Sequence, residues 1–283
     1  MLKTLLLFLP ALAIAQQTGI VQTPDVDLAY ESFGTATSAT PIIIANGGPG
    51  LSHIYMMQNA VWPRVAKTRQ IVFYDQRGTG KSTRLSEGAS QSIDAQVADL
   101  EAVRAKFNFA KFGLVGDSYG GFLAMAYAAA HPEHVDKLIL SDSAAPAMKD
   151  IVRVLPQVFP DMERSGDPQE QLRNHFRMLF YSEEKRDAYL AGAKDLGYNP
   201  QVGAAVSREI SKVDLTPKLK TFMFPTLVIT GRYDMNVAPL TAWNIYKAIP
   251  GAKFVVFSKS GHLPSYEEPD KYVQVVNEFL AGK

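Results

Sequence analysis

The sequence predicts an α/β domain with a mostly parallel sheet, helices on both faces and an inserted helical cap. Short β-branched runs alternate with helix-like stretches over most of the 283 residues. Strands that alternate with helices form parallel sheets covered on both faces. The alternation stops between residues 147 and 220, which are charged and rich in helix-like patterns. With 47% hydrophobic and 20% charged residues, the composition is that of a globular protein able to bury a sizeable core.

The individual elements can be placed from length and periodicity. Seven runs have the length and β-branched content of strands: residues 27–33, 41–45, 70–74, 112–115, 137–141, 225–230 and 253–257. Three stretches are typical of helices: residues 93–107, with apolar side chains at steps of three and four, residues 120–130 and residues 269–280. We therefore expect the core in residues 16–146 and 221–283 and the cap in residues 147–220.

The first 15 residues have the features of a signal peptide. Lys3 gives a basic start, an apolar run follows, and Ala13-Ile14-Ala15 has the small-x-small pattern of a cleavage site. The apolar run is about 11 residues, whereas a membrane-spanning helix needs roughly 20. A buried N-terminal helix is the alternative. The pattern predicts export, to the periplasm or out of the cell.

Composition narrows the classes of function. The chain has no cysteine, so disulfides, thiolate catalysis and zinc–thiolate sites are excluded. The net charge is +1 and no Lys/Arg run stands out, so we expect no nucleic-acid partner. No later segment is apolar enough to span a bilayer, and we expect no stable membrane insertion. Nothing in the sequence indicates an oligomeric state.

Residues 78–82, Gly-Thr-Gly-Lys-Ser, resemble part of a phosphate-binding loop. That motif requires a glycine three positions before the first of these, so that backbone N–H groups can wrap the phosphates. The residue there is Asp75, whose carboxylate would repel a phosphate. We therefore do not expect nucleotide binding.

A nucleophile elbow is the stronger signal. Residues 116–121, Gly-Asp-Ser-Tyr-Gly-Gly, join a predicted strand to a predicted helix. In G-x-S-x-G motifs of this kind the turn is sharp and strained, and it exposes the serine hydroxyl at the end of the strand. Small residues two before and two after Ser118 let the strand and helix approach closely. The sequence predicts Ser118 as a nucleophile.

A serine nucleophile needs a base, and the base needs an orienting carboxylate. The order expected for such an elbow is Ser, then Asp or Glu, then His. Asp234 follows the strand at 225–230, and His262 follows the strand at 253–257. Of the five histidines, only His262 combines this order with a strand end. We predict that Asp234 orients His262, which takes the proton from Ser118.

Acyl transfer also needs two donors aimed at the developing oxyanion. The backbone N–H of Tyr119 is one. The glycine-rich loop at residues 46–50, Asn-Gly-Gly-Pro-Gly, follows an earlier strand and can supply the other. We predict the N–H of Gly48 as that donor, with Gly47 as the alternative.

These motifs together resemble the proline iminopeptidase family of α/β-hydrolases. The resemblance rests on residues 47–50 (Gly-Gly-Pro-Gly), 75–82 (Asp-Gln-Arg-Gly-Thr-Gly-Lys-Ser), 116–121, 231–234 (Gly-Arg-Tyr-Asp) and Gly261-His262, in the family's order. It implies the α/β-hydrolase fold and the same roles for Ser118, Asp234, His262, Gly48 and Tyr119. It also implies that Asp75 and Arg77 form a buried ion pair that fixes the loop near the site.

The chain departs from the family at two places. Asn46 stands where the family usually has His. Family aminopeptidases also hold the substrate's ammonium with acidic residues, but Met235 and Asn236 follow Asp234. The cap offers Glu163, Glu170, Glu183, Glu184 and Glu209. Of these we choose Glu209 as a substrate-binding candidate, together with Gln201 from the cap and His53, which follows the glycine-rich loop.

Two reaction classes follow. One is an exported serine aminopeptidase that releases an N-terminal residue, which the family resemblance suggests could be proline, from short peptides. The other is an esterase or amidase on a small acyl substrate without a free amine. A non-catalytic binding protein on the same scaffold is disfavoured because all three triad residues are present. Neither reaction requires a metal or an organic cofactor.

Overall fold

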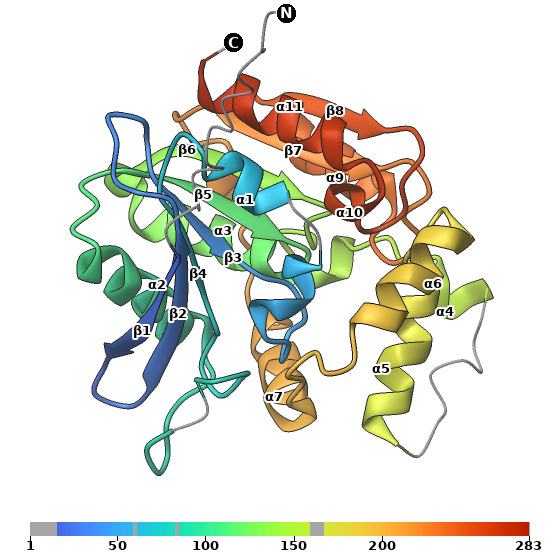
Figure 1. The fold of residues 1–283 in the computed structure, drawn as a ribbon, viewed down its shortest axis with the longest axis horizontal. Coiled ribbons are helices and arrows are strands. Elements are labelled where there is room, and N and C mark those ends of the chain that lie inside the picture. Colours follow the sequence, from blue (N-terminus) through green and yellow to red (C-terminus); the bar gives the residue numbers. More distant parts are fainter. Residues whose placement is uncertain (1–15, 59–60, 83–84, 159–166, 283) are drawn as a thin grey trace, which may run out of the picture.

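The fold is an eight-stranded sheet with helices on both faces (Figure 1). The computed structural model describes residues 16–58, 61–82, 85–158 and 167–282. The predicted signal peptide, residues 1–15, lies outside this described part, so its export function stays a prediction. The strands run in the order β1-β2-β4-β3-β5-β6-β7-β8. The β1–β2 and β2–β4 pairs are antiparallel. The strands from β4 onward in this order, β3 included, are all parallel.

The predicted fold class is confirmed, and so are the seven predicted strands to within two residues at either end. The strands are β1 (Gln16–Gln22), β2 (Asp27–Phe33), β3 (Ile42–Ala45), β4 (Ile71–Tyr74), β5 (Phe112–Asp117), β6 (Val135–Ser141), β7 (Thr226–Gly231) and β8 (Lys253–Phe257). Strand β1 was not predicted. Its residues are mostly exposed and polar, because it lies at the sheet edge and pairs only with β2.

Each face of the sheet carries its own apolar core. Ile43 of β3 packs into a core shared with α2 (Ile93–Lys106), α3 (Tyr119–Ala130) and α9 (Pro239–Ala248). Its neighbours Ile42 and Ile44 pack on the opposite face, with α1 (Val61–Val65) and α11 (Pro269–Leu280). All three isoleucines are fully buried. Burial of each contributes roughly 1.5–3 kcal/mol, so the continuous apolar run is what fixes β3 in the centre of the sheet.

The segment between β6 and β7 is helical in its described part. It holds the short helices η3 (Met148–Asp150), α4 (Leu155–Val158) and α8 (Thr216–Leu219), and the longer α5 (Pro168–Arg177), α6 (Glu183–Gly192) and α7 (Pro200–Ile210). An isolated bridge joins Ala147 to Asp214, so the segment leaves and re-enters the core at one place. Figure 1 shows α5, α6 and α7 gathered at one end of the sheet. We call this segment the cap.

The remaining elements are η1 (His53–Met57), η2 (Pro132–His134) and α10 (Pro264–Glu267). η1 follows the glycine-rich loop, and α10 follows the loop that carries His262. Among the described helices, none has the length and apolar character that crossing a membrane requires.

Candidate active site

Ser118 occupies a strained turn between β5 and α3. Its backbone has φ 53° and ψ −118°, and a positive φ is uncommon for a residue with a side chain. The two flanking glycines are required by close approach. A Cβ on Gly116 would lie 2.4 Å from the Gly120 carbonyl oxygen, and one on Gly120 would lie 2.0 Å from that of Ala45. The predicted strand–turn–helix elbow is present. As predicted, its two glycines let the strand and the helix approach closely.

Asp234 and His262 are paired in the interior. His262 Nδ1 lies 2.6 Å from Asp234 Oδ2, and both residues are buried. The other oxygen of Asp234 accepts the backbone N–H groups of Asn236 and Val237, each at 2.9 Å. Because its acceptors are held in this way, Asp234 fixes the proton of a neutral His262 on Nδ1 and leaves Nε2 as an acceptor.

Asn236 occupies the other side of the imidazole. Its Nδ2 lies 3.2 Å from His262 Nε2, and its Oδ1 accepts a hydrogen bond from Arg153 Nη2 at 3.1 Å. An arginine can only donate, so this contact sets the orientation of the amide and directs the Asn236 NH₂ group at Nε2. The sequence prediction did not include Asn236 or Arg153 in the site.

The glycine-rich loop reaches the elbow through Tyr55 of η1. The Gly47 N–H donates to the Tyr55 hydroxyl at 2.7 Å, and this hydroxyl donates to Asp117 Oδ2 at 2.5 Å. The Gly47 N–H is therefore engaged, so of the two glycines Gly48 stays the predicted oxyanion donor. Gly48 has φ +129°, a backbone conformation that side chains rarely adopt. The Tyr119 N–H, in the first turn of α3, has no acceptor within the helix.

These groups surround one cavity of about 480 Å³. Ser118, His262, Gly48 and Tyr119 all line it from the core, and residues of α5 and α7 line it from the cap. Among the described lining residues, Asp117 is the single carboxylate, whereas Arg153 and His175 are basic. The structure thus brings the predicted nucleophile, base and oxyanion donors to one cavity, and their catalytic roles stay predictions.

Burial dominates the electrostatics of this site. It raises the pKa of Asp117 to about 6, against the opposing influence of His262 and the hydrogen bond from Tyr55. Burial would lower the pKa of His262, but the charge of Asp234 and its hydrogen bond outweigh this, and the pKa is raised. His262 therefore needs a pH above its ordinary range to be fully neutral, which is the form that can act as a base.

Two further buried carboxyl groups hold the backbone next to Asp234 and His262, and both were missed from the sequence. Asp142 follows β6 and accepts the Gly231 N–H at 2.8 Å, and one of its oxygens lies within 4.8 Å of ligand atoms of both Asp234 and His262. Burial and the charge of Asp234 raise the pKa of Asp142 well above its usual range. Glu267 accepts the N–H groups of Gly261, Tyr181 and Ser182, which ties the histidine loop to the cap. Asp142 could have been found, because it stands at a strand's carboxyl end.

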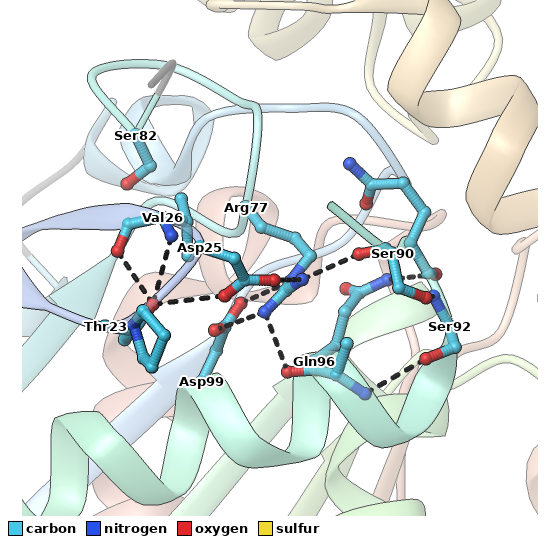
Figure 2. Close-up of polar contacts among 12 residues, drawn as sticks. Thr23, Asp25, Val26, Arg77, Ser82, Ser90, Ser92, Gln96 and Asp99 are labelled. Carbon is cyan, nitrogen blue, oxygen red and sulfur yellow. Dashed lines mark hydrogen bonds and ion pairs between the residues drawn. The ribbon is translucent and has the colours of Figure 1, made fainter. Parts of the chain in front are cut away.

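The predicted ion pair between Asp75 and Arg77 is wrong. Arg77 donates instead to Asp99, at 2.7 Å from both Nε and Nη2, and to Asp25 at 2.9 Å (Figure 2). Asp75 pairs with His53, whose Nδ1 lies 2.8 Å away, and accepts from Ser52 and from the Lys81 N–H. The loop that resembled a phosphate site thus closes on a carboxylate of its own chain.

None of the three predicted substrate-binding residues is among those that line the cavity. His53 is buried between Asp75 and Glu31 and stacks on Phe73. Glu209 forms an ion pair with Lys212 at 2.6 Å, one helical turn away on the outside of the cap. Gln201 is exposed at the start of α7. The structure does not bring these three side chains to the cavity, because sequence proximity to the loop or cap does not determine which side chains point inward.

Comparison with known proteins agrees with this geometry. Residues 40–269 match the family described as alpha/beta hydrolase fold, and the chain is an α/β-hydrolase. It belongs to the proline iminopeptidase family within that fold. It is 30% identical to a proline iminopeptidase of Lactobacillus delbrueckii subsp. lactis, over 88% of this chain and 93% of that protein. It is 29% identical to a proline iminopeptidase of Saccharolobus solfataricus, over 90% and 89%.

Solved structures show the same fold. An esterase from a Rhodococcus species superimposes with a TM-score of 0.79, covering 95% of this chain and 98% of that one, at 23% sequence identity. An esterase from Exiguobacterium antarcticum gives 0.77 at 20% identity, with 94% and 100% coverage. At these identities the likeness concerns the fold alone.

Proposed function

We propose that this protein is a serine hydrolase that works through an acyl-enzyme formed on Ser118. The observation that carries the proposal is that a serine in a strained elbow and a histidine backed by a buried aspartate line the same cavity. A serine hydroxyl is a weak nucleophile on its own and becomes effective beside such a base.

The proposed cycle uses groups already described. His262 Nε2 takes the proton of Ser118 as its oxygen attacks the substrate carbonyl, and the N–H groups of Gly48 and Tyr119 receive the oxyanion. Asp234 stabilises the imidazolium that forms. His262 then protonates the leaving group and later activates the water that releases the acyl group. The Asn236 amide must release Nε2, or share it, for the first proton transfer.

Two substrate classes compete for this site. Family membership supports the first, release of an N-terminal residue from short peptides, because the relatives are proline iminopeptidases. The cavity supports the second, an ester or amide without a free amine. Within the described lining, the single carboxylate is Asp117, which is buried behind Tyr55 and so poorly placed to bind an ammonium group. Glu163, one of the cap acids considered, lies outside the described residues.

The experiment is a turnover assay of wild type and Ser118→Ala on three substrates: a proline arylamide, its N-acetylated form and a short-chain aryl ester. We expect Ser118→Ala to lose nearly all turnover while its thermal unfolding is unchanged. Cleavage of the free-amine arylamide but not the acetylated one would support the first substrate class. Cleavage of the ester alone would support the second. Full activity in folded Ser118→Ala would overturn the proposal.

Export is a separate proposal, supported by the sequence pattern of residues 1–15. Expression in a bacterium followed by N-terminal sequencing tests it. A mature protein that begins at Gln16 in the periplasm or medium supports export, whereas an intact Met1 in the cytoplasm contradicts it.

A further inference from the structure

Arg153 of the cap lies between two residues whose backbone groups bond to the segment after Asp234. It stands between η3 and α4. The Val154 N–H donates to the Met235 carbonyl at 3.0 Å, and the Val152 carbonyl accepts the Ala238 N–H at 2.8 Å. These bonds couple the position of Arg153 to the same segment that carries the catalytic acid.

The Arg153 side chain lines the cavity and is joined to the base through one amide group. Its Nη2 donates to Asn236 Oδ1 at 3.1 Å, and Asn236 Nδ2 lies 3.2 Å from His262 Nε2. A guanidinium has five N–H donors in a planar fork, and this bond uses one of them. The fork matches the two oxygens of a carboxylate.

The position relative to His262 defines which part of the substrate Arg153 would contact. In the proposed cycle Nε2 delivers its proton to the leaving group, so that group must lie beside Nε2. Asn236 spans the distance from Nε2 to Arg153. The guanidinium is therefore one amide group away from the nitrogen beside which the leaving group binds.

The charge of the cavity agrees with an anionic ligand on this side. Asp117, the single carboxylate in the described lining, accepts the Tyr55 hydroxyl at 2.5 Å and is 3% exposed. Arg153 is exposed to the cavity and solvent. The charged group that a bound ligand can reach is thus a cation.

We propose that Arg153 binds a carboxylate carried by the leaving group of the substrate. This rests on the proposed serine hydrolase function and deepens it. For a peptide substrate the leaving group is then the C-terminal amino acid of a dipeptide. For an ester it is a hydroxy acid. In both cases the carboxylate takes the place of Asn236 Oδ1 on the guanidinium, or shares it, which also frees the Asn236 amide to move away from Nε2.

The test uses two matched substrate pairs that differ in the leaving-group charge. The first is prolylglycine and prolylglycinamide, and the second is 3-acetoxybenzoate and its methyl ester. The measured quantity is the ratio of kcat/KM for the charged member to that for the neutral one. We expect this ratio to fall about fivefold to tenfold in Arg153→Gln, a modest change because solvent screens an exposed ion pair. The fall should be smaller in Arg153→Lys, because lysine keeps the positive charge but lacks the planar fork.

The ratio separates recognition from structural damage. Loss of the Arg153–Asn236 bond affects both members of a pair, so this effect cancels. Arg208→Gln, which removes the same charge from an exposed cap position that does not line the cavity, should leave the ratio unchanged. A ratio that Arg153→Gln leaves unchanged in each cleaved pair overturns the proposal.

Binding tests the carboxylate site even if none of the four substrates is cleaved, because it does not depend on turnover. Calorimetry on Ser118→Ala would compare 3-hydroxybenzoate with 3-hydroxybenzamide, and prolylglycine with prolylglycinamide. Tighter binding of at least one charged ligand, lost when Arg153→Gln is added, supports the carboxylate site. Equal binding of charged and neutral ligands contradicts it.

Discussion

The described part of the molecule contains two buried histidine–aspartate pairs, and they differ in the group that faces the second ring nitrogen of the histidine. In the cavity, His262 Nδ1 meets Asp234 at 2.6 Å, and its Nε2 meets the neutral amide of Asn236. In η1, just after the glycine-rich loop, His53 Nδ1 lies 2.8 Å from Asp75, and its Nε2 lies 3.2 Å from the Glu31 carboxylate.

The group that faces Nε2, Asn236 or Glu31, distinguishes the proposed base His262 from His53, which is a fixed cation. Burial would lower the pKa of His53, but the hydrogen bonds and charges of Asp75 and Glu31 raise it to about 9. The imidazole is then charged at neutral pH and joins β2, η1 and the loop after β4. His262 has one carboxylate directly on it and a neutral donor on Nε2, which leaves Nε2 able to accept a proton. A buried pair of His and Asp is thus insufficient to identify a catalytic base.

The sharpest contrast is expected from removing each imidazole. His262→Gln should lower kcat by a factor of about 10⁴ or more, because the serine loses its base, with little effect on stability. His53→Gln should retain substantial turnover when the protein is folded. Steady-state kinetics at a temperature well below unfolding measures both. Comparable loss of kcat in the two folded variants would remove the distinction.

Asn236→Asp should make the catalytic pair resemble the structural one. A carboxylate facing Nε2 favours the imidazolium, so the pKa of His262 rises and kcat/KM at pH 7 falls roughly tenfold. Arg153 shares the new charge, which limits the effect. The loss should shrink as pH increases, and a pH–rate profile measures it. Asn244→Asp on the exposed face of α9 is the matched control. A loss independent of pH would contradict the explanation.

His53→Gln should remove a pH-dependent part of the stability. Because the folded pKa of about 9 exceeds the ordinary value of 6.5, the charged pair stabilises the fold fully below pH 6.5. That stabilisation, about 3 kcal/mol at most, is lost as pH rises through 9. Urea unfolding at pH 6, 7.5 and 9.5 should show a gap between wild type and variant that narrows with pH. A gap of constant size would mean that His53 contributes through packing and not through charge.

Glu31→Gln should have the smallest effect. It removes one of the two carboxylates that hold His53 charged, so the pKa of His53 falls and the loss of stability begins at lower pH. Since the Glu31 side chain is 21% exposed, we expect only about 1 kcal/mol at pH 7. Equilibrium unfolding measures this, with turnover as the control, because Glu31 does not line the cavity. A stability equal to that of wild type across pH 6 to 9 would exclude a role for Glu31.

The sequence was sufficient for the fold and for the residues fixed by local geometry. β-branched runs predicted the central strands, and the glycines around Ser118 predicted the elbow, because each depends on residues close in the chain. Asp234 and His262 could be placed because strand ends of a parallel sheet meet at one edge. Strand β1 was missed because an exposed edge strand needs no apolar alternation.

Which charged side chains pair with one another could not be predicted in the same way. Asp75 and Arg77 are two residues apart, yet Arg77 extends to Asp99 and Asp25 (Figure 2). Asp75 instead pairs with His53. These pairings depend on how α2 and η1 pack on the sheet, and no local sequence pattern predicts that packing. Arg153 was missed for the same reason, since its place in the cavity arises from backbone bonds to the segment after Asp234.

The most direct test of this comparison is ¹⁵N NMR of the histidine rings across a pH titration, with resonances assigned from His53→Gln and His262→Gln. We predict that His53 titrates near pH 9 and at a higher pH than His262, and that neutral His262 carries its proton on Nδ1. If His262 titrated above His53, or carried its proton on Nε2, the distinction between a catalytic base and a structural cation would be contradicted.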